Sequence, residues 1–164
     1  MDKLVGELLL LLRELLASYQ RLLQIATLRQ DAMRAFDIEA LNKLIERERA
    51  ETQRLEMIEK LRRVLVEQMK LQLGRNVEPT ITEIAKRVAE PNRSVLLGLA
   101  GQIKSIVEQV ERNNRINAKV SEAVVKSLSK VLKIVTGMAQ NAGLYMRNGR
   151  KAALHGIHML EVTA

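Results

Sequence analysis

The sequence predicts an all-α fold: an elongated antiparallel bundle of three long helices, with one short connecting helix and a C-terminal tail. Apolar residues recur at steps of three and four over long stretches, which is the spacing of one buried helix face. Only two prolines occur in 164 residues, and no stretch shows strand alternation. Aromatic side chains number three, so Leu, Ile, Val, Met and Ala must build the core, as in long helical bundles.

The longest periodic stretch covers residues 92–139. At ~1.5 Å per residue it forms a rod of roughly 70 Å, which needs partners of similar length beside it. We expect its apolar stripe to be buried; the stripe comprises Leu96, Leu99, Ile103, Ile106, Val110, Val120, Val124, Val131, Ile134 and Met138.

Two asparagines, Asn113 and Asn117, occupy the steps between Val110 and Val120 in that stripe. A buried amide without hydrogen-bond partners costs ~1–3 kcal/mol. Polar residues at such positions are tolerated where they fix the register of neighbouring helices. We interpret both as structural register residues; the alternative is a polar notch that a partner recognises.

Residues 2–35 form the first predicted helix, and Asp37 is expected to cap a second helix that ends near Leu73. Residues 46–54 are nearly all charged, and we interpret them as a solvated face in which Glu48 and Glu51 keep unperturbed pKa values. The predicted stripe of the second helix includes Ile38, Leu41, Ile45, Leu55, Ile58, Leu65 and Met69.

A loop at residues 74–79 separates the second helix from a short one. Thr80 and Glu83 match a capping box, in which Thr80 caps the helix and Glu83 reaches back to it. The short helix should end near Ala89, and Pro91 then stands at the start of the third long helix.

We assign residues 1–139 to the helical bundle and residues 140–164 to a C-terminal partner-binding tail of the same domain. Recurrent glycines in the tail each lower helix stability by ~1 kcal/mol relative to Ala, yet the tail is rich in Met and Leu. Such a segment either folds on a partner or packs as a fourth helical piece on the bundle. Its order without a partner stays open.

The positive charge lies in the second half of the chain. Residues 1–90 hold 16 basic and 15 acidic side chains, whereas residues 91–164 hold 11 and 4. An acidic protein, nucleic acid or a membrane surface would suit this distribution. Nucleic acid is disfavoured because no recognition motif or aromatic platform accompanies the basic residues.

Membrane insertion and catalysis are both disfavoured. The leucine run at residues 8–12 is too short to cross a bilayer, so we expect a cytoplasmic protein. The chain has no cysteine, and its two histidines, His155 and His158, have no acidic residue near them before Glu161. We therefore predict no enzyme, no metal and no cofactor, and the role of the two histidines stays open.

Four short elements, in this order, resemble the FlgN family of flagellar type III export chaperones. Residues 36–41 are similar to the family's "gD-leaL" turn, and a Pro-bracketed segment at 80–91 precedes the third helix. Residues 113–117 resemble its "N-x-x-L" region, and residues 145–150 its "tYd-x-G" element, with Met146 at the position of the usual acid. The resemblance covers nearly the full chain.

The resemblance implies a cytoplasmic chaperone that binds the amphipathic C-terminal segment of hook–filament junction proteins, prevents their aggregation and delivers them to the export gate. Its partner-binding residues would be the apolar Met138, Leu144, Tyr145, Met146, Leu154 and Ile157 and the basic Arg147, Arg150 and Lys151. The competing classes are a structural, oligomer-forming coiled coil without a client and a basic nucleic-acid-binding protein. The identity of the bound junction protein, the oligomeric state and any self-association stay open.

Overall fold

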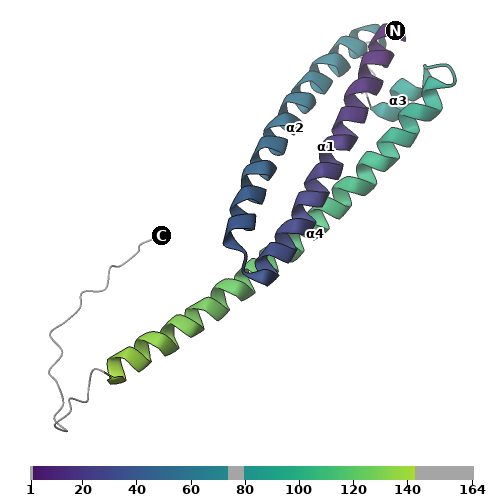
Figure 1. Ribbon diagram of the computed structural model, residues 1–164. Coiled ribbons are helices and arrows are strands. Elements are labelled where there is room, and N and C mark those ends of the chain that lie inside the picture. Colours follow the sequence, from purple (N-terminus) through teal and green to yellow (C-terminus); the bar gives the residue numbers. More distant parts are fainter. Residues whose placement is uncertain (1, 74–79, 143–164) are drawn as a thin grey trace, which may run out of the picture. The chain divides into compact units, whose positions relative to one another are not determined.

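The computed structural model of the protein describes residues 2–73 and 80–142. These residues form the helices α1 (Asp2–Ala35), α2 (Ile38–Leu73), α3 (Ile81–Lys86) and α4 (Asn92–Ala142), shown in Figure 1. No strand occurs within the described ranges, so the predicted all-α class is confirmed. The helix ends agree with the sequence except that α3 stops before Ala89 and α4 continues past residue 139.

The chain divides into two compact units, Met1–Ser121 and Glu122–Ala164, and their boundary falls inside α4. The sequence-based division was placed later, between residues 139 and 140. The first unit contains α1, α2, α3 and the beginning of α4, and the described part of the second is α4 from residue 122 onward.

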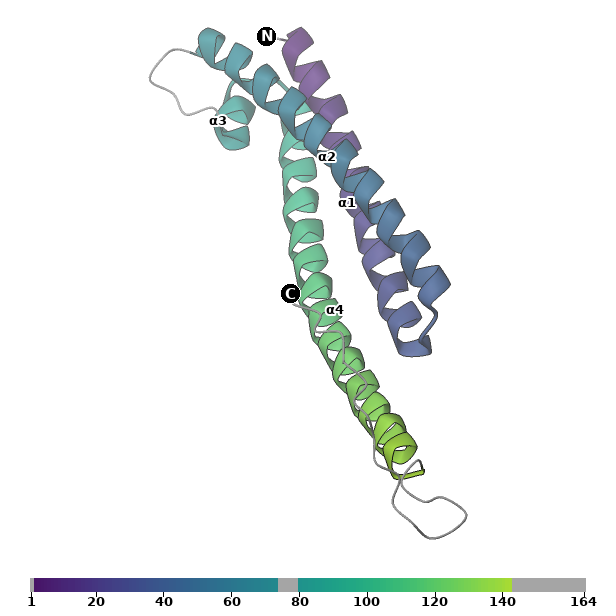
Figure 2. The same cartoon turned by 90° about the vertical axis from the view of Figure 1, so that its left-hand side faces the viewer.

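Within the first unit, α1 and α2 lie side by side and run in opposite directions (Figures 1 and 2). The first part of α4 runs in the same direction as α1, and two asparagines connect these helices. Asn117 donates from Nδ2 to the carbonyl oxygen of Ala26 at 2.7 Å, and Asn113 donates to Oγ1 of Thr27 at 3.2 Å. Asn117 is buried, as its place in the stripe predicted.

The turn between α1 and α2 combines a helix stop with a helix start. Phe36 adopts a left-handed backbone with φ 55°, and the N–H of Asp37 donates to the carbonyl of Ala32 at 3.0 Å, which closes the last turn of α1. The carboxylate of Asp37 then accepts from the N–H of Ala40 at 2.9 Å. The predicted cap on α2 is therefore confirmed.

One hydrophobic core holds the first unit together. Leu8 and Leu12 of α1, Met69 of α2, Ile84 of α3 and Leu96 of α4 are almost fully buried and belong to one cluster. Burying a side chain of this size stabilises the fold by ~1.5–3 kcal/mol. Thr80 caps α3 by accepting from the N–H of Glu83, as predicted, while the Glu83 carboxylate pairs with Lys86 instead of reaching back to Thr80.

The stripe predicted for α2 is wrong in its first half, because Ile38 and Ile45 are exposed and Leu44 is buried instead. Three-four steps taken backward from Ile58 pass through Leu55, Glu51 and Glu48 and reach Leu44. The two glutamates thus lie on the face that α2 turns toward α1.

The interpretation of residues 46–54 as a solvated face is therefore also wrong for this pair of acids. Glu51 accepts from Arg21 of α1 at 2.7 Å, and Glu48 pairs with Arg29 of α1. The hydrogen bond from Arg21 lowers the pKa of Glu51, against the opposing effect of burial. The sequence gives no sign of these pairs, since the partners are 19 and 30 residues apart.

Candidate partner-binding surface

Most of the partner-binding residues predicted from the sequence lie outside the described residues. These are Leu144, Tyr145, Met146, Arg147, Arg150, Lys151, Leu154 and Ile157, and the same holds for His155 and His158. The backbone of Met138 belongs to α4, but its side chain is also outside the described part. The described part of the second unit, residues 122–142 of α4, lies directly before these positions in the chain.

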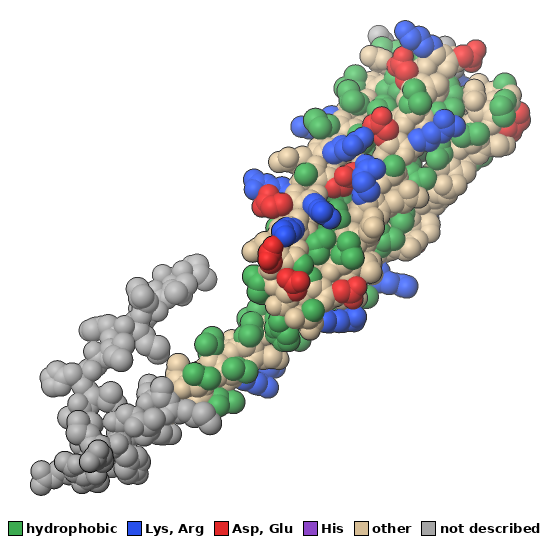
Figure 3. Space-filling view, viewed as in Figure 1, with side chains coloured by type: hydrophobic (Ala, Val, Ile, Leu, Met, Phe, Trp, Pro, Cys, Tyr) green, Lys and Arg blue, Asp and Glu red, His purple; other side chains and the backbone are tan. Residues whose placement is uncertain are grey.

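Apolar side chains are exposed along this part of α4. Six of them have exposed fractions between 45% and 63%: Val125, Leu128, Val131, Leu132, Ile134 and Val135. Figure 3 shows hydrophobic side chains covering much of the visible surface of these turns. A surface of this density is unusual for an isolated protein and typically marks a site of interaction.

The exposed residues form one broad apolar face. Val124, Leu128, Val131 and Val135 follow steps of four, three and four, so they lie in one row along the helix. Val125 and Leu132 extend that row on one side, since they stand one position after Val124 and Val131. We call Val124, Val125, Leu128, Val131, Leu132, Ile134 and Val135 the α4 apolar face.

The opposite side of the same turns is basic. Lys126, Lys130 and Lys133 are also spaced by four and three, and at 100° per residue they lie roughly opposite the row of Leu128 and Val131. All three are exposed, and none forms an ion pair with another described side chain. This part of the helix is therefore amphipathic, and the side opposite the apolar face is positively charged.

Two hydroxyl groups near the apolar face are already satisfied within the helix. Ser127 Oγ donates to the carbonyl of Ala123 at 2.9 Å, and Thr136 Oγ1 donates to the carbonyl of Leu132 at 2.8 Å. They offer a partner little polar chemistry. Recognition at this face therefore depends on shape and apolar burial.

The buried stripe predicted for residues 92–139 is wrong at Val131 and Ile134, which are exposed. The exposed Val125, Leu128, Leu132 and Val135 were not part of that prediction. Helix length was a signal that could have found them. α1 and α2 have 34 and 36 residues, whereas α4 has 51, so helices of their length cannot cover α4 completely.

The described residues contain no group of three or more His, Cys, Asp or Glu side chains placed to hold a metal ion. No helix among them is both long and apolar enough to span a bilayer.

A protein-family model described as "FlgN protein" matches residues 1–153. No curated protein and no solved structure matches the chain. The family match includes all of the described helices and most of the residues that follow them.

Proposed function

The chain belongs to the FlgN family of flagellar export chaperones, and from this premise we propose that its C-terminal helical region binds hook–filament junction proteins before export. The bound element would be the amphipathic C-terminal segment of the client. In this proposal the protein works in the cytoplasm, prevents premature aggregation of that segment and delivers the client to the export gate.

The observation that carries this proposal is the exposure of the α4 apolar face. A helical client segment could bury its own apolar stripe against Leu128, Val131 and Val135, which form one row. Each square ångström of apolar surface removed from water contributes about 25 cal/mol, so several branched side chains can support a complex. The predicted anchors Leu144, Tyr145, Met146, Leu154 and Ile157 would extend this surface toward the C-terminus.

Helix propensity supports the same assignment. Val124, Val125, Val131, Ile134 and Val135 are β-branched, and such residues lose side-chain freedom in a helix. A helix with this composition, whose apolar side chains are exposed, gains little from burial in the free protein. Client binding would supply the missing burial, which favours coupling between binding and helix stability.

Charge would assist encounter more than final affinity. Lys126, Lys130 and Lys133, on the opposite side of these turns, are joined by the predicted Arg147, Arg150 and Lys151, and the summed positive charge accelerates association with acidic partners. We expect the association rate with an acidic client to fall as salt rises, while the dissociation rate changes little.

The test is isothermal titration with a peptide from the C-terminus of a junction protein. Leu128→Gln combined with Leu132→Gln should weaken binding at least about tenfold, because two apolar contacts are lost. Deleting residues 140–164 should abolish binding while helicity and melting of the remaining chain stay nearly unchanged. Lys130→Gln on the opposite side is the matched control and should leave affinity within about twofold.

Three results would contradict this assignment. Full affinity in the Leu128→Gln, Leu132→Gln variant would remove the α4 apolar face from the binding site. Unfolding of the protein after deletion of residues 140–164 would show that this segment belongs to the core. Absence of any client binding would favour the alternative of a structural coiled-coil protein.

A further inference from the structure

Helix α2 carries a second apolar row beside its core-facing row. Met57, Leu61, Val64, Gln68 and Leu71 follow steps of four, three, four and three, which is the repeat of a coiled-coil contact. We call these five residues the α2 outer row. The core-facing row of α2, with Ile58, Leu65 and Met69, lies on another side of the helix.

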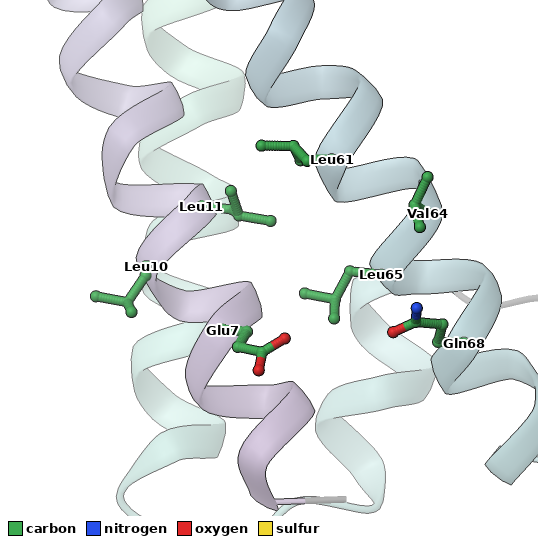
Figure 4. A pocket seen from close by; sticks show the side chains of 7 residues that line it. All are labelled: Glu7, Leu10, Leu11, Leu61, Val64, Leu65 and Gln68. Carbon is green, nitrogen blue, oxygen red and sulfur yellow. The ribbon is translucent and has the colours of Figure 1, made fainter.

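The α2 outer row is unusually exposed for apolar residues. Its four hydrophobic members have exposed fractions between 57% and 79%. Leu61, Val64 and Gln68 also line a groove against Glu7, Leu10 and Leu11 of α1, shown in Figure 4. Leu10 is itself 60% exposed, so both helices contribute apolar surface to this side of the first unit.

Charged residues along the outer edge of this row are self-complementary. Lys60 stands one position before Leu61, and Glu67 stands one position before Gln68, so they occupy equivalent places in successive repeats. Both are exposed, and neither pairs with another described side chain. In an antiparallel pair of identical helices, residues at such places face each other across the contact.

We propose that the α2 outer row pairs antiparallel with the same row of a second copy of this chain, with Lys60 of each copy against Glu67 of the other. A two-fold axis near residue 63 places Leu61 of one copy against Val64 of the other. Because of this symmetry, the ion pair between Lys60 and Glu67 forms twice in each dimer. The Glu7–Leu11 turn of α1 is level with this axis, because Leu10 and Leu11 share the groove with Leu61 and Val64. Leu10 of each copy would therefore add to the contact.

The charge pattern is the argument for a second copy and for its direction. In a parallel pair, Lys60 of one copy would face Leu65 of the other, and Glu67 would face Gln72. Neither contact brings opposite charges together. In the antiparallel pair, Arg63 of one copy lies near Arg63 of the other. These like charges are further from the contact row, where long side chains can point into solvent.

The size of the contact predicts a weak dimer. The row spans 15 residues, or about 22 Å of helix, and with Leu10 buries roughly 1,000 Å² in total, which is at the lower end for specific complexes. The dimer should therefore form reversibly as concentration rises. This inference is independent of the proposed client binding, because it concerns the first unit only.

Sedimentation velocity of the full chain over a hundredfold range of concentration tests the proposal. We expect a reversible shift from monomer to dimer. Leu61→Gln should weaken the dimer at least about tenfold, since the substitution occurs twice in each dimer. Ile45→Gln, at an exposed apolar position on the same helix but outside the row, is the control and should change nothing.

Charge exchange tests the direction of pairing. Lys60→Glu should weaken the dimer by about threefold to tenfold, because each Glu67 would then face a like charge. The double variant Lys60→Glu, Glu67→Lys should restore it to near the original strength. A monomer at every concentration, a dimer indifferent to Leu61→Gln, or no recovery in the double variant would each overturn the proposal. All of these positions are exposed, and circular dichroism would confirm that each variant is folded.

Discussion

Helix α4 contains two parts in which apolar residues have the same spacing but different surroundings. Before residue 122, Leu96, Leu99 and Val110 are buried in the first unit, and Asn117 is buried beside them. After that residue, Leu128, Leu132 and Val135 follow similar steps and are exposed. The spacing of apolar residues therefore predicts a helix and its apolar face, while the neighbouring elements decide whether that face is covered.

The difference also separates two roles within one helix. In the first part, apolar burial and hydrogen bonds to α1 stabilise the unit. In the second part, the same type of side chain is exposed, and in the proposed function it binds the client. Substitutions in the two parts should accordingly affect different measurements.

The largest expected effect is on core burial. Leu96→Ala should lower the free energy of unfolding by about 3 kcal/mol, because Leu96 is fully buried and the substitution leaves a cavity. Leu132→Ala, at a position 63% exposed, should lower it by less than about 0.5 kcal/mol. Urea unfolding followed by circular dichroism gives both values. Equal losses for the two variants would remove the distinction between the two parts of α4.

A smaller effect is expected at the polar position of the covered part. Asn117→Asp keeps the shape of the side chain, but it replaces the donor to the Ala26 carbonyl by a buried charge without a partner. We expect a loss of about 2 kcal/mol at pH 7. Asn114→Asp, on the exposed side of the same turn, should be close to neutral in the same unfolding measurement. If both variants were neutral, Asn117 would have no part in holding α4 against α1.

The ion pair between α1 and α2 predicts a pH dependence for the first unit. Because the pKa of Glu51 is lowered from 4.5, its contribution is fully present above pH 4.5 and is lost as pH falls through the folded-state value. Glu51→Gln should lower the free energy of unfolding by about 1 kcal/mol or less at pH 7. The difference in stability between the variant and the unsubstituted protein should disappear in acid. Thermal melting from pH 7 to pH 3 measures this difference, and a difference that widened in acid would contradict the assignment.

The smallest expected effect is at the α1–α2 turn. Phe36→Gly removes the cost of a left-handed backbone at φ 55° but adds chain entropy in the unfolded state. The net effect should raise the free energy of unfolding by about 0.5 kcal/mol, which is measured as a higher Tm. Phe36→Ala is the comparison variant and should show no such gain, because alanine shares the left-handed cost.

The sequence predicted those features that depend on neighbouring residues along the chain. Helix ends at Ala35 and Leu73, the Asp37 and Thr80 caps, and the buried positions Leu8 and Leu96 follow from local periodicity and capping chemistry. The burial of Asn117 was predicted, but other features that depend on distant residues were wrong or absent. The pairs of Glu48 and Glu51 with α1, and the exposure of Val131, depend on which helix lies beside which, and local spacing carries no such information.

The α4 apolar face could not be predicted for the same reason. The sequence placed partner binding near the C-terminus from Met-rich composition and charge, and those anchors lie outside the described residues except for the backbone of Met138. The α4 apolar face was absent from that prediction, because Leu128 and Val135 have the composition of core residues. Their exposure became evident only from the three-dimensional structure.

Hydrogen–deuterium exchange of the full chain, with and without the C-terminal peptide of a junction protein, tests the central claim most directly. In the free protein, amides of residues 96–117 should exchange slowly and those of residues 122–137 quickly, because Leu96 and Leu99 belong to the hydrophobic core whereas Leu128, Leu132 and Val135 are exposed. The peptide should slow exchange in residues 122–137 and leave residues 96–117 unchanged. Protection that appeared only in the first unit, or no protection of residues 122–137 under saturating peptide, would contradict the assignment of the α4 apolar face as the binding surface.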